Sequence, residues 1–148
     1  MTITIPERIE AMRAGTNPTV ICQVPSGWVV LCDMQYLWGY CILLADPIVS
    51  SLNDLNQEQR TQYLRDMALV GDTLLEVTGA HRINYAIMGN SDPYLHAHIT
   101  PRFITEPVEY LHNHPWSYPK SVMNENTFDY EREKELIEKL RQAIQARL

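Results

Sequence analysis

The chain has 148 residues, the size of one domain around a single hydrophobic core. Its 18 Asp and Glu residues outnumber its 12 Lys and Arg residues, the formal net charge is −6, and no basic run appears, so we expect no nucleic-acid partner. No apolar run approaches the ~20 residues that cross a bilayer, and the polar N-terminus carries no secretory signal, so we expect no membrane partner and a cytoplasmic location.

The first third of the chain predicts one short helix and three strands. Residues 6–14 read as a helix, because Pro6 suits a first helical position and Gly15 can close the last turn. Three apolar runs separated by turn-forming segments follow, and we predict consecutive antiparallel strands at residues 19–23, 28–32 and 40–44. The cysteines form no Cys-x-x-Cys pair and lie in these runs, so we predict packed, reduced thiols at Cys22, Cys32 and Cys41.

The middle of the chain predicts a long helix and two more strands. Asn56 and Gln59 have the spacing of a capping box, apolar side chains recur at helical spacing over residues 57–78, and Gly79 ends that pattern. Residues 83–88 and 95–100 read as the fourth and fifth strands. The expected fold class is α+β: a five-stranded antiparallel sheet with helices on one face, namely the long covering helix and a C-terminal helix over residues 127–148.

Residues 94–102 read Tyr-Leu-His-Ala-His-Ile-Thr-Pro-Arg and alternate polar with apolar side chains, as a strand with two different faces does. His96 and His98 therefore point the same way, roughly 7 Å apart, close enough to grip one phosphate or one metal ion. An isolated His-x-His pair is weak evidence of a site, but the polar turn that precedes this strand favours a small-ligand corner. Pro101 has no N–H to donate, so we expect it to end the strand.

This stretch resembles the signature of the histidine-triad (HIT) superfamily, in which three histidines alternate with apolar residues and Pro-Arg often follows. The resemblance implies a single HIT-like domain over residues 1–148, with its core at residues 17–103 and an irregular tail at residues 104–126. Two positions depart from the family pattern, since Tyr94 stands in place of the first triad histidine and Tyr40 in place of the histidine that follows a glycine. The residues that carry the resemblance are Asp33, Gly39, Tyr40, Gly89, Asn90, Pro93 and the run 95–102.

The resemblance also implies an activity, a nucleotide hydrolase or nucleotidyl transferase. His96 corresponds to the family's nucleophile, which attacks the α-phosphate of a nucleotide or dinucleoside polyphosphate and forms a nucleotidyl-histidine. His98 corresponds to the third triad histidine and would donate to the phosphate or the leaving group. Neutral imidazole suits this chemistry, because it splits one displacement at phosphorus into two easier steps. The resemblance implies no cofactor and no metal.

Further substrate contacts follow from the same resemblance. Asn90 would face the phosphate, and Asp33 would hold the ribose hydroxyls, although a plain turn residue is an equal interpretation of Asp33. Tyr40 and Tyr94 would still meet beside the substrate, as neutral phenols in place of a titratable imidazole pair. Apolar side chains near Asp33 are candidates to flank the base: Val30, Leu31 and Leu43.

A homodimer is expected, because a five-stranded sheet has an exposed edge and HIT domains commonly join their sheets edge to edge. Trp116, Tyr118 and the last helix would then reach the partner's site. Two alternative functions stay open. One is a nucleotide-binding regulatory module with little turnover, and the other is a metal-binding domain in which His112 and His114 of the tail complete a four-histidine site with the histidine strand.

Overall fold

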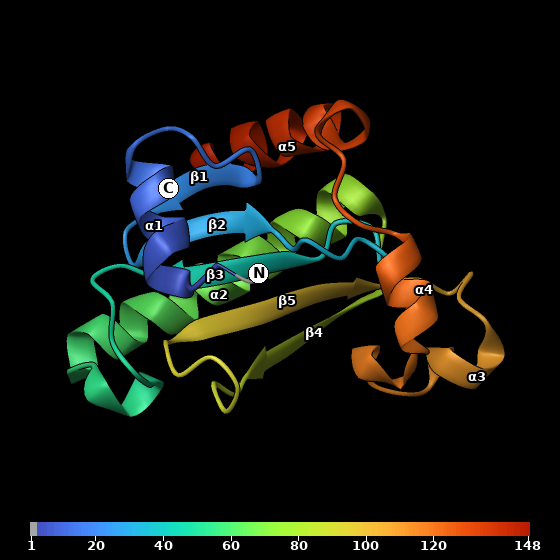
Figure 1. Ribbon diagram of the computed structural model, residues 1–148, viewed down its shortest axis with the longest axis horizontal. Helices are drawn as coiled ribbons and strands as arrows, with labels where there is room; N and C mark the ends of the chain where they lie inside the picture. Colours follow the sequence, from blue (N-terminus) through green and yellow to red (C-terminus); the bar gives the residue numbers. More distant parts are fainter. Residues whose placement is uncertain (1–2) are drawn as a thin grey trace.

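A computed structural model of the chain describes residues 3–148. Five antiparallel strands form one sheet in the order β1-β2-β3-β5-β4 (Figure 1), which confirms the predicted sheet. The strand bounds differ from the predicted ones by one or two residues. They are β1 Val20–Val24, β2 Gly27–Leu31, β3 Cys41–Ala45, β4 Arg82–Ile87 and β5 His96–Arg102.

The long helix α2 matches its prediction at both ends. Asn56 and Gln59 form the capping box, and Gly79 ends the helix with a φ of 74°, a left-handed conformation that glycine adopts without strain. The predicted buried, free thiols are confirmed for all three cysteines. The helices are α1 Ile5–Arg13, η1 Leu52–Asp54, α2 Gln57–Thr78, α3 Val108–Leu111, η2 Pro115–Ser117, α4 Lys120–Glu125 and α5 Tyr130–Gln145. No helix within residues 3–148 combines the length and the apolar character needed to cross a bilayer.

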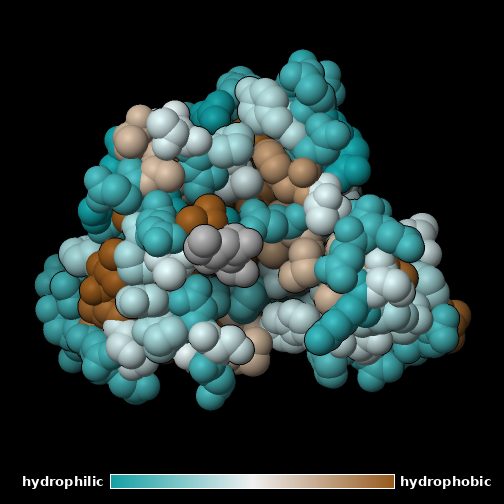
Figure 2. Space-filling model, in the orientation of Figure 1, coloured by the Kyte–Doolittle hydropathy of each residue, from teal (hydrophilic) through white to brown (hydrophobic). Residues whose placement is uncertain are grey.

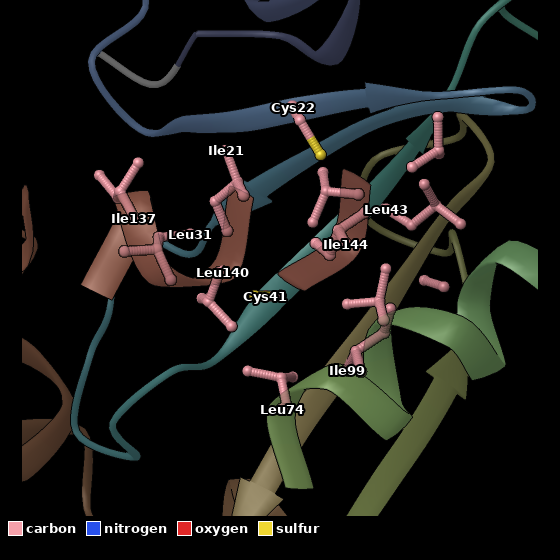
Figure 3. Close-up of a cluster of buried hydrophobic side chains, with 14 of the residues drawn as sticks. Ile21, Cys22, Leu31, Cys41, Leu43, Leu74, Ile99, Ile137, Leu140 and Ile144 are labelled. Atoms are coloured by element: carbon pink, nitrogen blue, oxygen red, sulfur yellow. The ribbon is translucent and has the colours of Figure 1, made fainter. Parts of the chain in front are cut away.

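Helices cover both faces of the sheet. α2 and α5 pack over the main core, where Leu74 and Leu140 lie among side chains of β3 and β5 (Figure 3). On the opposite face α1 packs Ile5, Ile9 and Met12 against the sheet. The prediction of helices on one face only was wrong, because β2 and β3 carry buried apolar side chains on both faces and each face needs a cover.

Pro101 does not end the last strand, which continues to Arg102. The backbone carbonyl of Leu95 accepts a hydrogen bond from the N–H of Ala45, the last residue of β3. The backbone N–H and C=O groups of odd-numbered residues in this strand therefore point towards β3. The β3 ladder ends opposite Ile99. The missing N–H of Pro101 therefore faces a side without a partner strand, no ladder hydrogen bond is lost, and the predicted strand end was wrong.

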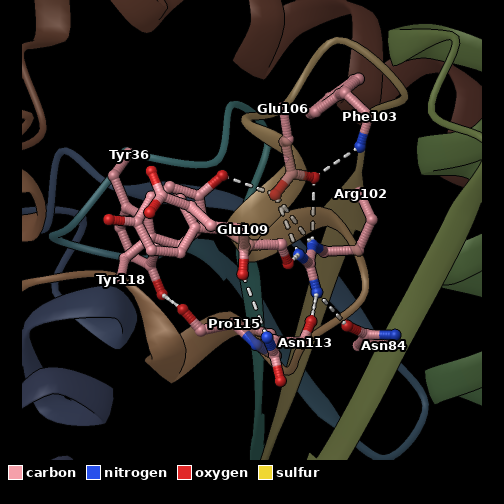
Figure 4. A network of polar contacts seen from close by, with 10 residues as sticks. Tyr36, Asn84, Arg102, Phe103, Glu106, Glu109, Asn113, Pro115 and Tyr118 are labelled. Carbon is pink, nitrogen blue, oxygen red and sulfur yellow. Dashed lines mark hydrogen bonds and ion pairs between the residues drawn. The ribbon is translucent and has the colours of Figure 1, made fainter.

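The tail after β5 folds into the short elements α3, η2 and α4 beside the end of the sheet (Figure 1). Arg102 and Glu106 form a bidentate ion pair at 2.9 Å, with both side chains at most 5% exposed. Arg102 also donates to the carbonyls of Tyr110 and Asn113, and Tyr118 donates to Glu106 at 2.6 Å (Figure 4). We call this cluster the latch, because it ties the tail to the strand that carries the histidines.

Candidate active site

His96 and His98 lie side by side on the face of the sheet that α1 also covers. In the antiparallel register they stand opposite Leu44 and Ile42 of β3. Their ring centroids are 5.0 Å apart with an angle of 69° between the planes. The predicted common orientation of the two imidazoles is confirmed, and one small group can touch both rings.

The Nδ1 atom of His96 is held by the backbone. It lies 2.6 Å from the carbonyl oxygen of Tyr94. A carbonyl oxygen can only accept, so Nδ1 carries the proton and donates it. Because a neutral imidazole has one proton, the Nε2 atom of His96 keeps a free lone pair.

The opposite tautomer is favoured at His98, whose Nδ1 lies 2.6 Å from the hydroxyl of Tyr40. Tyr40 is completely buried, and burial raises the pKa of its phenol, so the hydroxyl keeps its proton. His98 is the one hydrogen-bond partner of this hydroxyl within residues 3–148, so we assign the phenol as the donor and Nδ1 as the acceptor. The proton of neutral His98 then resides on Nε2. Burial, with a smaller contribution from neighbouring His96, lowers the pKa of His98 to about 4, so this ring is neutral at physiological pH.

A cavity of about 230 Å³ opens over the two histidines. Its lining combines apolar side chains with the charged side chains of Arg8, Asp33 and Asp92. Figure 2 shows this side of the molecule, where apolar side chains lie between α1 and the tail within a mostly hydrophilic surface. The apolar part of the lining includes Ile3, Ile5, Val30, Ile42 and Leu44.

Arg8 of α1 reaches across the cavity to Asp33 at the end of β2. Its Nη2 donates to Oδ2 of Asp33 at 2.6 Å, and its Nη1 donates to Oδ1 at 3.4 Å. The Asp33 side chain is 55% exposed, so one side of the carboxylate stays open to solvent. Sequence reasoning named Asp33 but missed Arg8, since nothing in a short amphipathic helix indicates that its arginine contacts a residue 25 positions away.

Trp116 of η2 stands against the second histidine. Its ring is perpendicular to that of His98, with the centroids 5.2 Å apart. The expectation was that Trp116 would reach a partner's site, but within this chain it lines the cavity of its own histidines. The latch explains this position, because Arg102 and Glu106 hold the segment that leads to Trp116 against the end of β5.

No family model matches the sequence, and no curated protein sequence is significantly similar to it. Solved structures do match. A histidine-triad protein from Bradyrhizobium japonicum is 24% identical, with 84% of this chain and 89% of that one covered and a TM-score of 0.65. A histidine-triad protein from Marinobacter aquaeolei VT8 is 19% identical, with 95% and 94% covered and a TM-score of 0.72. The chain has the histidine-triad fold. The diadenosine triphosphate hydrolase of Plasmodium falciparum is also similar, at 16% identity, 87% and 78% coverage and a TM-score of 0.62.

Within the histidine-triad fold, the two tyrosine positions do not meet. Leu44 stands opposite His96 and Ile42 opposite His98, so Tyr94 lies beyond one end of this pairing and Tyr40 beyond the other. The Tyr94 side chain packs in the apolar cluster under α1, while its carbonyl holds His96. The prediction that the phenols are neighbours was wrong. In this antiparallel register a residue further back on β3 pairs with one further forward on β5, so Tyr40 and Tyr94 lie at opposite ends of the paired segment.

Two further predicted contacts do not line the histidine cavity. Asn90 is exposed in the turn between β4 and β5, and Asp92 of the same turn lines the cavity instead. Leu43 is buried in the core on the other face of the sheet, so it cannot flank a base beside Asp33. Val30 and Leu31 do line the cavity. The alternation of side chains along β3 separates Leu43 from its neighbours Ile42 and Leu44.

The four-histidine metal site of the second alternative is not formed. Within residues 3–148, no three His, Cys, Asp or Glu side chains are grouped as metal ligands. Trp116 lies near both histidine pairs, with its ring 5.2 Å from that of His98 and 6.4 Å from that of His114. The indole thereby occupies the space in which the tail histidines would have to approach the histidine strand.

Proposed function

We propose that the protein binds a nucleotide and transfers its nucleotidyl group through a nucleotidyl-histidine at His96, as a phosphohydrolase or nucleotidyl transferase. The observation that carries the proposal is the pair of contacts at Nδ1, that of His96 with the Tyr94 carbonyl and that of His98 with the Tyr40 hydroxyl. From these contacts we assign a lone pair to Nε2 of His96 and an N–H to Nε2 of His98. A nucleophile beside a hydrogen-bond donor is the arrangement that displacement at an α-phosphorus needs.

In the first step, the Nε2 lone pair of His96 attacks the α-phosphorus, and a P–N bond forms as the P–O bond to the leaving group breaks. The electron pair of that bond stays on the leaving oxygen. The ring of His96 gains positive charge, so its Nδ1–H bond to the Tyr94 carbonyl becomes charge-assisted and strengthens. A contact that tightens as the reaction proceeds lowers the barrier more than it strengthens substrate binding.

His98 acts in this step as a hydrogen-bond donor to the phosphate or to the leaving oxygen. It is a poor proton donor because its ring is already neutral. Loss of the Nε2 proton would leave an imidazolate unless Nδ1 took the proton of Tyr40 at the same time. Burial raises the pKa of Tyr40, which opposes formation of a tyrosinate. The site therefore suits leaving groups that depart as stable anions, such as phosphates.

In the second step, water or another acceptor attacks the phosphorus of the nucleotidyl-histidine. A new P–O bond forms, the P–N bond breaks, and its electron pair returns to Nε2 of His96. A proton of the attacking water passes to solvent, and the neutral ring is restored. The Tyr94 carbonyl keeps Nδ1 protonated throughout, so the lone pair reappears at Nε2 for the next turnover.

The lining of the cavity around the histidines suits the chemistry of a nucleoside monophosphate portion. Its apolar residues, with Val30, Ile42 and Leu44 on the sheet and Ile5 on α1, can cover a base. The open side of the Asp33 carboxylate can accept hydrogen bonds from ribose hydroxyls. A neighbour of the same fold is named a diadenosine triphosphate hydrolase, which supports a dinucleoside polyphosphate as a substrate class for this chain.

We also propose a homodimer joined through the edge of β4. The outer edge of β1 is partly covered, because Arg141 of α5 donates to the carbonyl of Ile21 at 2.8 Å. The outer edge of β4 has no such cover within the described chain, and Tyr85 and Met88 beside it are 41% and 56% exposed. An unpaired strand edge with apolar neighbours favours pairing with a second copy. Light scattering at micromolar concentration tests this, and a monomer contradicts it.

The regulatory alternative shares the same cavity and is favoured by the occupied Asp33. The carboxylate already holds Arg8, so ribose hydroxyls compete with an ion pair. In that case nucleotides bind and are released unchanged. Turnover under saturating nucleotide separates this alternative from the proposed enzyme.

A thermal-shift screen followed by intermediate trapping tests the proposal. Nucleoside monophosphates and dinucleoside polyphosphates should raise the melting temperature, since they bind only the folded state. Quenching a reaction at alkaline pH, where a P–N bond survives, should leave a nucleotidyl mass on the peptide that contains His96. His98→Gln should be tested alongside the wild type, because this variant keeps the nucleophile His96. A shift with divalent metal ions alone, or an adduct on another residue, contradicts the proposal.

A further inference from the structure

A second and larger cavity of about 850 Å³ lies on the same face of the sheet, between the strands β4 and β5 and the tail. We call it the β4–β5 groove. Its floor is formed by side chains of the two strands that point to the histidine face, and its wall is formed by the segment from α3 to η2. The residues that matter most are Arg82, Asn84, Leu111, His112, His114 and Trp116.

The charge of the groove is opposite to that of the chain. The whole protein has a formal net charge of −6. Yet among the described residues that line the groove none is acidic, whereas two are arginines and three are histidines. Arg102 is neutralised by Glu106, but Arg82 is exposed and forms no ion pair within residues 3–148. A cation in a concave site without carboxylates attracts anions.

Asn84 adds an oriented donor to the floor. Its Oδ1 accepts a hydrogen bond from Nη1 of Arg102 at 2.9 Å (Figure 4). This bond fixes the amide so that the nitrogen remains available to a ligand in the groove. The latch thus orients the floor of the groove while it holds the tail.

The groove adjoins the histidine cavity. Trp116 lines both, and β5 runs beneath both. In the β4–β5 ladder His98 pairs with Ala86, and Arg102 pairs with Arg82, four residues further along the strand. At about 3.3 Å per residue, Arg82 lies roughly 13 Å further along the strand direction than His98. A group that leaves the α-phosphate beside His98 would reach this cation by passing beside Trp116 along β5.

From this arrangement we infer that the β4–β5 groove is an anion-binding subsite for the phosphorylated leaving group of the substrate. This inference rests on the proposed nucleotidyl transfer at His96. Arg82 takes the distal phosphate, Asn84 donates to it, and His112 and His114 line the opposite wall. The substrate class is then a nucleotide whose α-phosphate carries a polyphosphate or a second nucleoside phosphate.

The chemistry of the histidines agrees with this ligand. His98 is placed to donate a hydrogen bond, but its neutral ring is a poor proton donor, so the leaving group departs as an anion. A departing polyphosphate keeps its negative charge and gains a contact with Arg82. The groove and the histidines therefore select the same class of leaving group, from two ends of one strand.

Inorganic tripolyphosphate tests the subsite without any turnover. In spectra of the histidine ring signals it should shift His112 and His114, and calorimetry should give an affinity that weakens about tenfold in Arg82→Gln, as expected for loss of one charge-assisted contact. Arg65→Gln is the matched control, because Arg65 is an exposed arginine of α2 on the other face of the sheet. The control should bind like the wild type.

Kinetics then connect the subsite to the reaction. With two substrates that share a nucleoside monophosphate portion, one with a phosphorylated and one with an unphosphorylated leaving group, Arg82→Gln should lower the ratio of their kcat/KM values about tenfold. Tripolyphosphate binding that is equally strong in Arg82→Gln, or that shifts only His96 and His98, overturns the inference. If no substrate turns over but tripolyphosphate binds with the expected dependence on Arg82, the subsite stands and the proposed turnover fails.

Discussion

The two ends of β5 carry basic side chains that differ in how many of their hydrogen-bonding groups have a partner in the protein. At one end, His96 and His98 each use one ring nitrogen in a hydrogen bond and present the other to a cavity. At the other end, Arg102 is 3% exposed, and its guanidinium donates to Glu106, to Asn84 and to two backbone carbonyls. The two histidines have spare hydrogen-bonding capacity, and the guanidinium of Arg102 has none.

This difference separates a reactive end of the strand from a structural one. A polar side chain whose partners are all supplied by the protein contributes to folding, because leaving any partner unpaired in a buried place costs free energy. A polar side chain with one free nitrogen can bind or react with a ligand. The latch also serves the reactive end, since it holds Trp116 beside His98. Substitutions at the two ends should therefore act on different quantities.

The largest effect is expected at His96. In His96→Asn the nucleophile is absent, so kcat should fall by several orders of magnitude while the Kd for nucleotide changes little, since a nucleophile acts mainly in the transition state. Single-turnover kinetics and calorimetry with the same nucleotide measure the two quantities. Wild-type hydrolysis by the variant would mean that another group is the nucleophile.

At the structural end, Glu106→Gln should act on stability. Burial alone would raise the pKa of Glu106, but hydrogen bonds from Arg102, Tyr118 and the Phe103 N–H outweigh it and hold that pKa below its ordinary value. Removing the carboxylate charge leaves Arg102 buried without its counter-charge, which typically costs about 3–5 kcal/mol of unfolding free energy. Urea unfolding measures the loss.

Glu76→Gln is the matched control for this substitution. Glu76 pairs with Arg147 on the surface, and its side chain is 63% exposed. An exposed pair contributes at most about 1 kcal/mol. Equal losses in the two variants would show that the latch contributes no more than a surface ion pair.

The same contrast explains how much could be predicted from the sequence. Side-chain alternation and helix caps are local signals, so the five strands, the long helix and the common face of His96 and His98 were predicted correctly. Arg8 and Trp116 were not found as cavity residues, because their contacts with Asp33 and His98 join segments far apart in the chain. The periodicity of polar and apolar residues along the sequence carries no information about contacts of this kind. The strand register had to be seen before the two tyrosine positions could be separated.

A third prediction concerns pH and sharpens the account of His98. Burial lowers its pKa from 6.5 to about 4, so the unfolded chain takes up a proton at higher pH than the folded protein does. The contribution of His98 to stability is therefore complete above about pH 6.5 and is lost as the pH falls towards 4. After allowance for partial solvation, the loss should be about 2 kcal/mol.

His98→Gln isolates this contribution, because it removes the titrating ring and leaves an amide oxygen near Tyr40. Unfolding free energies of the wild type and the variant, measured at pH 7 and pH 4.5, should diverge on acidification. The wild type should lose more stability than the variant. Parallel curves would mean that the ring titrates in the folded protein as it does in the unfolded chain.

The smallest effects distinguish the two tyrosines. Tyr40→Phe removes the donor to Nδ1 of His98, so the ring no longer has one preferred tautomer, and kcat should fall about tenfold, the equivalent of one hydrogen bond. Tyr94→Phe keeps the backbone carbonyl that holds His96, and its side chain lies in the apolar cluster under α1, so kcat should change less than about twofold. Tyr94→His should likewise change the rate less than Tyr40→His does. If Tyr94→Phe instead slows the reaction more than Tyr40→Phe does, the side chain of Tyr94 contacts the substrate. The assignment of the Tyr40 phenol to His98 and of the Tyr94 carbonyl to His96 would then be wrong.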